Sequence, residues 1–206
     1  TGFPLLGVSA ISIDPTNPNT LIIGTGEVYG SGLAEPGTIN RYTRGSYGIG
    51  ILRSTDAGQS WTHVLDFARD SIIGVNDIET NPNLTSEVFA ATTIGLYKST
   101  DGGINWNKIF NANNCIDIEI DPNADSIIYF TQGNFNEALD PSACGIFKST
   151  DHGNTFQELQ GGLLNTWSGS SKLVIDPSNS NILYASLQVS WYNNGPTTPG
   201  GIYKFT

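Results

Sequence analysis

The sequence predicts an all-β fold, a β-propeller made of four-stranded antiparallel blades. Charged residues form only 14% of the 206 residues while glycine alone contributes 24, a balance that favours short strands and tight turns over helices. No window keeps the 3.6-residue apolar period of an amphipathic helix. Two short motifs also recur in step along the chain, at a period typical of propeller blades.

The clearest of the two motifs occurs three times. It reads RSTDAGQSW at 53–61, KSTDGGINW at 98–106 and KSTDHGNTF at 148–156. Its serines lie 45 (99 − 54) and then 50 (149 − 99) residues apart. Because propeller repeats of four strands have periods of about 40–50 residues, the motif is expected once per blade.

Each blade is expected to contain four strands, A to D, in chain order. Strands A and B flank an Asn/Pro/Asp turn, as in ISIDPTNPNTLIIGTG at 11–26. Strand C precedes the repeated motif, which turns the chain into strand D. The predicted blades are about 5–68, 72–111, 114–160 and 170–206, all within one partial propeller covering 1–206. The fourth blade lacks strand D, and three complete blades close a ring poorly, since typical rings have ~4–8 blades. We therefore expect a fragment.

The repeated motif resembles the Asp-box of the BNR-repeat propellers, a superfamily that includes sialidases, sortilin-type receptors and xyloglucanases. DPTNPNTLIIGTGE followed by GIGILRSTDAGQSW is most similar to large secreted propeller proteins of the Bacteroidetes, which commonly end in a type IX secretion sorting domain. The resemblance covers essentially the whole chain. It implies a bacterial protein that is extracellular or lies at the cell surface.

The residues of the Asp-boxes are expected to serve structure. An Asp in such a turn accepts hydrogen bonds from its own backbone, the following Gly allows a positive φ, and the closing aromatic packs between blades. The residues given this role are Ser54, Asp56, Gly58, Trp61, Ser99, Asp101, Gly103, Trp106, Ser149, Asp151, Gly153 and Phe156. Calcium binding is the alternative, but each loop offers one carboxylate where Ca²⁺ takes ~6–8 oxygens, so neither metal nor cofactor is expected.

Binding is expected in the loops that join strand B to C and strand D to A. These loops emerge on the face opposite the Asp-boxes and carry all the variation in length. Their aromatic and amide side chains suit carbohydrate, because the faces of sugar rings stack on aromatic rings. The candidates are Tyr29, Arg41, Tyr42, Arg44, Tyr47, Phe135, Trp167, Trp191 and Tyr192. The alternative is that these aromatics only hold the loops on the blades.

Two functions compete. The favoured hypothesis is a secreted, non-catalytic binding or adhesion module with a glycan or protein ligand, attached to further blades or domains of its parent protein. The alternative is part of a glycoside hydrolase similar to xyloglucanases, which the resemblance implies would use two aspartates on separate blades. The nearest acids are Glu27, Glu35, Glu137 and Asp140. They match no motif of the family, so solvated loop acids are the simpler interpretation.

Charge and cysteines complete the predictions. A net charge of −10 with nine basic residues argues against binding to nucleic acid, and no apolar run is long enough to insert into a membrane.

Cys115 opens the third blade and Cys144 closes its B–C loop on the same face. We expect a disulfide closing a loop of 29 (144 − 115) residues, worth ~3–4 kcal/mol and consistent with an extracellular location. The alternative is two buried thiols that are not joined.

Overall fold

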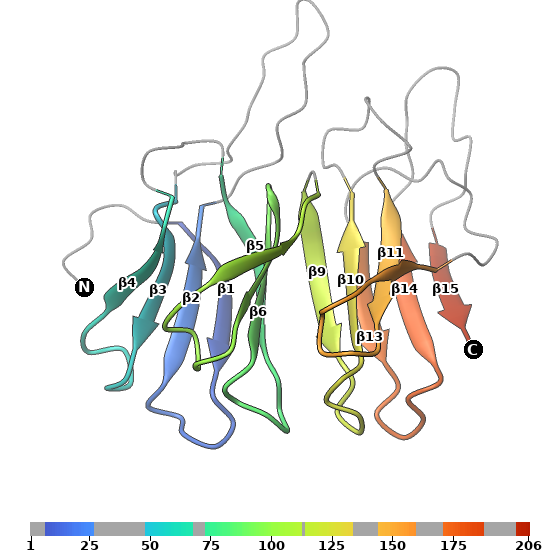
Figure 1. Cartoon of the computed structure of the whole chain (residues 1–206), viewed down its shortest axis with the longest axis horizontal. Helices are drawn as coiled ribbons and strands as arrows, with labels where there is room; N and C mark the ends of the chain where they lie inside the picture. Colours follow the sequence, from blue (N-terminus) through green and yellow to red (C-terminus); the bar gives the residue numbers. More distant parts are fainter. Residues whose placement is uncertain are drawn as a thin grey trace, which may run out of the picture.

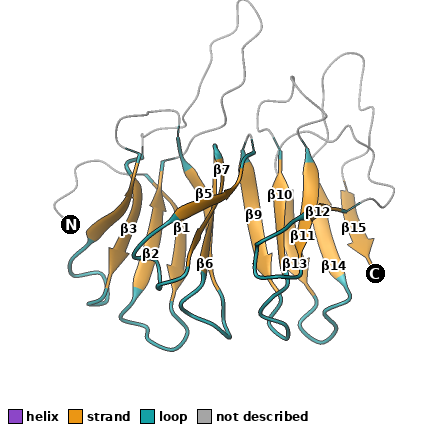
Figure 2. Ribbon diagram, in the orientation of Figure 1, coloured by secondary structure: helices purple, strands orange, loops and turns teal. Residues whose placement is uncertain are grey.

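The computed structural model describes residues 7–26, 48–67, 73–112, 114–133, 144–159, 171–187 and 201–206. Within these ranges every regular element is a β-strand, which confirms the all-β prediction. The strands form four separate sheets that stand side by side along the molecule (Figures 1 and 2). Among the residues described, no helix is long and apolar enough to cross a bilayer.

Each sheet contains strands that are consecutive in sequence and antiparallel in space. The first sheet holds β1 (Val8–Ile13), β2 (Leu21–Thr25), β3 (Gly50–Ser54) and β4 (Thr62–Asp66). The second holds β5 (Val75–Thr80), β6 (Val88–Thr92), β7 (Gly95–Ser99) and β8 (Asn107–Phe110). The third holds β9 (Cys115–Ile120), β10 (Ile128–Gln132), β11 (Gly145–Ser149) and β12 (Gln157–Glu158). The fourth has three strands, β13 (Ser171–Ile175), β14 (Leu183–Leu187) and β15 (Gly201–Phe205).

The turn between the first two strands of each sheet is built by short polar side chains. Asp14 Oδ1 accepts hydrogen bonds from the backbone N and the hydroxyl of Thr16, at 2.8 and 2.7 Å. Asp176 bonds in the same way to Ser178, at 2.9 and 2.7 Å. Such bonds to the backbone two residues ahead stabilise a turn before any tertiary contact forms. The four turns of this kind lie at one end of the sheets (Figure 1).

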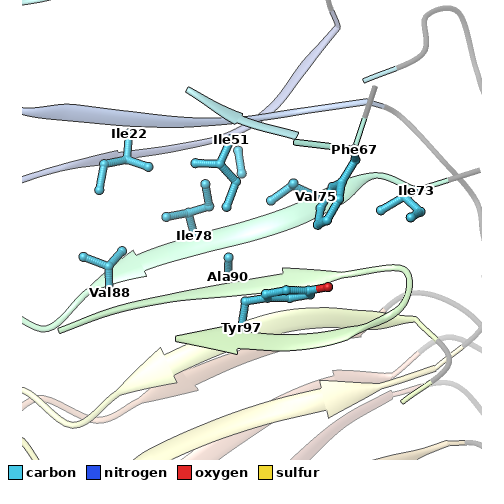
Figure 3. Close-up of a cluster of buried hydrophobic side chains, with 10 residues drawn as sticks. Ile22, Ile51, Phe67, Ile73, Val75, Ile78, Val88, Ala90 and Tyr97 are labelled. Atoms are coloured by element: carbon cyan, nitrogen blue, oxygen red, sulfur yellow. The ribbon is translucent and has the colours of Figure 1, made fainter. Parts of the chain in front are cut away.

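The hydrophobic core is divided among the three junctions between neighbouring sheets. At the first junction Ile22 and Ile51 of the first sheet face Val75 and Ile78 of the second (Figure 3). The second junction joins Phe89, Ala91 and Leu96 to Cys115, Ile118, Ile120, Ile128 and Phe130. The third joins Tyr129, Cys144 and Ile146 to Leu173, Ile175, Leu183, Ala185 and Leu187. Full burial of one such side chain contributes about 1.5–3 kcal/mol, so face-to-face stacking holds the sheets together.

The first strands of the sheets lie next to one another. Strand β1 packs on β5, β5 packs on β9, and β9 packs on β13. The sheets therefore converge at their first strands, which is the arrangement of blades around a propeller axis. The fold is thus the predicted one, with four-stranded antiparallel blades and a fourth that has three strands among the described residues.

The predicted disulfide between Cys115 and Cys144 is wrong. Strand β10 separates the two, because Gln132 pairs with Cys115 on one side and with Gly145 on the other. Two strand spacings of ~4.8 Å exceed the ~7 Å that a disulfide spans between Cα atoms. The side chains also belong to different junctions, and neither thiol is part of a disulfide. Burial raises the pKa of the Cys115 thiol well above its ordinary value, so this thiol stays protonated.

Candidate functional site

The three Asp-boxes share one set of hydrogen bonds. In the first, Asp56 Oδ1 accepts from Ser60 N and from Ser54 Oγ, each at 2.8 Å, and Gly58 N donates to Ser54 Oγ at 2.9 Å. Hydrogen bonds from the Ser60 hydroxyl and backbone lower the pKa of Asp56 to about 2. The equivalent bonds lower the pKa values of Asp101 and Asp151 to about 2 as well. Carboxylates this acidic stay ionised and hold their turns, so they are poor proton donors at neutral pH.

The Asp-boxes also join one blade to the next. Arg53 Nε donates to the carbonyl of Gly102 in the second box at 2.8 Å. Lys98 Nζ donates to the carbonyl of His152 in the third box at 2.7 Å and lies 2.6 Å from Glu87 Oε1. Arg53 and Lys98 each come directly before the serine of their own box. The box motif therefore fixes where each basic residue lies relative to the next blade. These residues act as structural connections between blades.

The residues predicted for binding and catalysis lie outside the described part of the chain. They are Glu27, Tyr29, Glu35, Arg41, Tyr42, Arg44, Tyr47, Phe135, Glu137, Asp140, Trp167, Trp191 and Tyr192. Their roles stay predictions. The described strands bring together a different group of ionisable side chains.

That group is the inner acidic cluster, defined as Asp77 and Glu79 on β5, Asp117 and Glu119 on β9, and Lys172 on β13. Alternation along a strand directs every second side chain to the same face. Asp77, Asp117 and Glu119 lie on the face of their blade that meets the following blade, as their bonds to that blade show. Glu79 lies on the same face because it is two residues after Asp77 on β5. The cluster therefore occupies the inner edge of the second and third junctions, where the first strands converge.

Three of the acids bond to the backbone of the next blade. Asp77 Oδ2 accepts from Ile118 N at 3.0 Å, and Asp117 Oδ2 accepts from Leu173 N at 2.5 Å. Glu119 also accepts a backbone hydrogen bond, from Ile175. A first strand is an edge strand, so one side of its backbone has no partner within its own sheet. The carboxylates of the preceding blade supply that partner.

Lys172 provides the positive charge of the cluster. Its Nζ contacts Asp117 Oδ1 directly and lies 3.9 Å from Asp77 Oδ2. Burial lowers the pKa of Lys172, but its hydrogen bond to Asp117 and the nearby negative charges outweigh that effect and raise the pKa. The cluster thus contains one ammonium group and four carboxyl groups. The charge of Lys172 alone therefore cannot neutralise the cluster if all four carboxyl groups ionise.

Burial and crowding keep protons on part of the cluster. Burial, together with the charges of Glu119 and Asp77, raises the pKa of Glu79 to about 8. Burial likewise raises the pKa of Glu119 to about 7, with Asp117 adding to the effect. Burial also raises the pKa of Asp117, while the hydrogen bond from Lys172 acts in the opposite direction. Glu79 is therefore protonated at neutral pH and is able to donate a proton.

Reasoning from the sequence missed the inner acidic cluster. Its signal was present as acids alternating with isoleucine, in NDIET at 76–80 and CIDIEI at 115–120. The alternation was interpreted only as a strand pattern, because the sequence does not show that two such strands become neighbours. Within the described ranges, no three His, Cys, Asp or Glu side chains are placed to share a metal ion.

Comparison with known proteins agrees with this architecture. The model of the BNR/Asp-box repeat matches residues 97–108, which contain the second box. The crystal structure of a GH74 enzyme from Niastella koreensis superposes with a TM-score of 0.62 and 26% identity, covering 96% of this chain and 28% of that one. The chain consists of Asp-box propeller blades.

Relatives of these Asp-box blades include two curated xyloglucanases. Xyloglucanase Xgh74A of Acetivibrio thermocellus is 26% identical over 179 residues, which are 75% of this chain and 20% of that protein. A probable oligoxyloglucan-reducing end-specific xyloglucanase of Neosartorya fischeri is 25% identical over 145 residues, 51% of this chain and 18% of that protein. The Asp-box blades thus span about a fifth of the length of these relatives.

These relatives correct the favoured hypothesis about function. A non-catalytic binding or adhesion module is contradicted, because the curated proteins similar to the chain are xyloglucanases. The comparisons support the alternative, part of a glycoside hydrolase. The sequence misled on this point because the loop acids Glu27, Glu35, Glu137 and Asp140 match no motif of the family.

Proposed function

We propose that these Asp-box blades form part of the propeller of a glycoside hydrolase that acts on xyloglucan or a related β-glucan. The observation that carries the proposal is the 26% identity to a xyloglucanase across 75% of the chain. Hydrolysis of a glycosidic bond by two carboxyl groups needs no cofactor. We also propose an extracellular location, since xyloglucan is a polymer too large to be taken up intact.

The inner acidic cluster contains one group suited to the acid step. Glu79 keeps its proton at neutral pH because of burial and its acidic neighbours, as the general acid of a glycosidase does. The carboxylates of Asp77 and Asp117 already bond to the backbone of the next blade, which leaves Glu79 as the group without that structural task. We propose Glu79 as proton donor.

The B–C loops are proposed to contact the substrate. Glu27, Glu137 and Asp140 belong to B–C loops, which leave the blades at the end opposite the Asp-boxes. The aromatic residues of the same loops, Tyr29 and Tyr42 among them, are proposed to stack on sugar rings. These loops would then supply the substrate contacts.

The test is release of reducing ends from xyloglucan by the full chain, together with calorimetric titration of xyloglucan oligosaccharides. We expect Glu79→Gln to lower the hydrolysis rate by about 10²-fold or more while leaving oligosaccharide affinity within a few-fold. Glu158→Gln is the matched control, because Glu158 is exposed on β12, the fourth strand of its blade. A chain that neither hydrolyses nor binds xyloglucan would refute the proposed function. Hydrolysis that survives Glu79→Gln would refute the role of Glu79 alone.

A further inference from the structure

Asp77, Asp117 and Lys172 hold the same position in the first strands of three successive blades. Each pairs with the fourth residue of the second strand in its own blade. The fourth blade therefore places an ammonium group where the second and third blades place a carboxylate. Because β5 packs on β9 and β9 on β13, the three charged side chains lie at one level of the inner acidic cluster.

Both aspartates of the cluster have a hydrogen-bond donor for each carboxylate oxygen. Asp77 accepts a backbone N–H group at each oxygen, at 2.9 and 3.0 Å. Asp117 accepts Lys172 Nζ at Oδ1 and the backbone N–H of Leu173 at Oδ2. Hydrogen bonds donated to a carboxylate favour its ionised form. The hydrogen bonding therefore holds Asp77 and Asp117 as carboxylates.

Glu79 differs from both aspartates in its hydrogen bonding. Among the described residues, none donates a hydrogen bond to its carboxyl group. Glu119 is intermediate, because it accepts one backbone hydrogen bond, from Ile175. The strand β1, which also packs on β5, carries no titratable side chain over Val8–Ile13. A proton of the cluster therefore resides most favourably on Glu79, and the raised pKa of Glu79 agrees with this placement.

Lys172 supplies the positive charge that Asp117 requires to stay ionised. The side chain of Asp117 is 2% exposed and that of Lys172 is 67% exposed, so the lysine reaches from solvent to a buried carboxylate. A buried carboxylate that loses its cationic partner takes up a proton, because desolvation disfavours the charge. Without Lys172, the cluster would therefore hold a proton on Asp117.

The charge of Asp117 in turn acts on Glu79. Burial raises the pKa of Glu79, and three negative charges add to that effect, those of Glu119, Asp77 and Asp117. Lys172 lowers this pKa, but by less than Asp117 raises it. Loss of Lys172 that leaves Asp117 protonated thus removes the larger of the two opposing effects. The pKa of Glu79 then falls, and the proton moves from Glu79 to Asp117.

We propose that Lys172 is a positioning residue for Glu79. By bridging carboxylates of two blades, it keeps Asp77 and Asp117 ionised and leaves the proton of the cluster on Glu79. Lys172 acts through Asp117 and is a poor proton donor itself, since its own pKa is raised. This inference rests on the proposed function, in which Glu79 is the proton donor.

The first test follows the side-chain carboxyl carbons of the full chain by carbon-13 NMR between pH 4 and pH 10. The variants Glu79→Gln and Asp117→Asn assign the two signals. In the parent we expect Glu79 to lose its proton at a higher pH than Asp117. In Lys172→Met this order should reverse, with the midpoint of Asp117 raised by about 1 unit or more and that of Glu79 lowered.

Three further variants separate placement of the proton from a merely structural role. Lys172→Arg keeps the charge and the donor, so both midpoints should stay as in the parent. Lys204→Met is the matched control, because Lys204 is exposed on β15 of the same blade and outside the cluster. Lys172→Gln repeats the test if Lys172→Met folds poorly, and it should move both midpoints in the same directions. A structural role alone would lower the thermal midpoint and leave the titration of Glu79 in place.

The second test is the pH dependence of kcat/KM for hydrolysis of xyloglucan. Its alkaline limb reports the pKa of the acid in the free enzyme, so Lys172→Met should move this limb to lower pH and Lys172→Arg should not. The proposal is overturned if the midpoint of Glu79 stays or rises in Lys172→Met, or if the alkaline limb of an active Lys172→Met stays in place. A chain that shows the expected titrations and no hydrolysis refutes the proposed function and leaves the placement of the proton standing.

Discussion

Asp77 on the second blade accepts a hydrogen bond from the backbone N–H of Ile118 on the third, at 3.0 Å. One side chain thereby completes the backbone bonding of a strand in a different sheet. Asp117 and Leu173 repeat the arrangement one blade further on. Blade stacking is thus directional and polar at the inner edge, in addition to the apolar packing of the faces.

Asp77→Ala should destabilise the junction of the second and third blades. The substitution leaves Ile118 N without its acceptor, and an unsatisfied buried donor costs about 1–3 kcal/mol. Urea unfolding should therefore show a lower midpoint. Glu158→Ala, on the exposed β12, is the control and should change the midpoint little. Equal midpoints for Asp77→Ala and the parent would mean that water replaces the carboxylate without loss.

Stability should fall as the pH rises from about 4.5 to about 8. Burial raises the pKa of Glu79 from 4.5 to about 8 in the folded state, so the folded state binds more protons than the unfolded state in this window. The contribution of Glu79 is fully present below the unfolded pKa and is lost as the pH passes the folded one. Urea midpoints at pH 5, 7 and 9 measure the trend.

Glu79→Gln tests whether this residue causes the pH dependence. The amide cannot ionise, so the variant should be more stable than the parent at pH 9 by about 1 kcal/mol or more. At about pH 3, where Glu79 is protonated in both the folded and the unfolded state, the two proteins should be nearly equal. A variant whose stability varies with pH as steeply as that of the parent would assign the effect to Glu119 or Asp117.

Gly103→Ala should cost more stability than Gly102→Ala. Both glycines have positive φ, 83° and 71°, so both substitutions carry the backbone strain of a side chain in that region. A Cβ on Gly103 would lie 2.4 Å from Ile22 Cδ1 on the first blade, whereas on Gly102 nothing lies nearer than 3.9 Å. We expect about 1–2 kcal/mol for Gly102→Ala and at least 1 kcal/mol more for Gly103→Ala. Similar thermal midpoints for the two would contradict the close approach of box and blade.

Lys98→Met should be among the most destabilising single changes. Lys98 pairs with Glu87 at 2.6 Å and donates to the carbonyl of His152, and both charged side chains are largely buried. Removing one partner of a buried pair costs about 3–5 kcal/mol, and the contacts of Glu87 Oε2 with His152 Nδ1 and Asn81 Nδ2 should offset part of that cost. Adding Glu87→Gln to Lys98→Met should recover part of the loss, measured as coupling in a double-mutant cycle. Additive effects of the two substitutions would contradict a direct pairing.

Several features of the fold could be predicted because they are local. The box motif specifies its own turn, since Ser54, Asp56 and Ser60 bond to one another within seven residues. The Asp14 turn is equally local. Repetition of the box at spacings of 45 and 50 residues indicated blades, and the alternating strands between the turns supplied the sheets. The disulfide prediction failed because it used position along the blade and ignored the strand that lies between Cys115 and Cys144.

By itself, the sequence determined the strands, the turns and the stacking repeat, because these depend on residues a few positions apart and on alternation along a strand. Only the tertiary structure decided which side chains meet across a junction. Glu79 and Glu119 are 40 residues apart in sequence, and their pKa values rise because stacking buries them beside each other. The same stacking leaves Ile11 and Ile202 open at the two ends, since a face is buried only where another blade covers it.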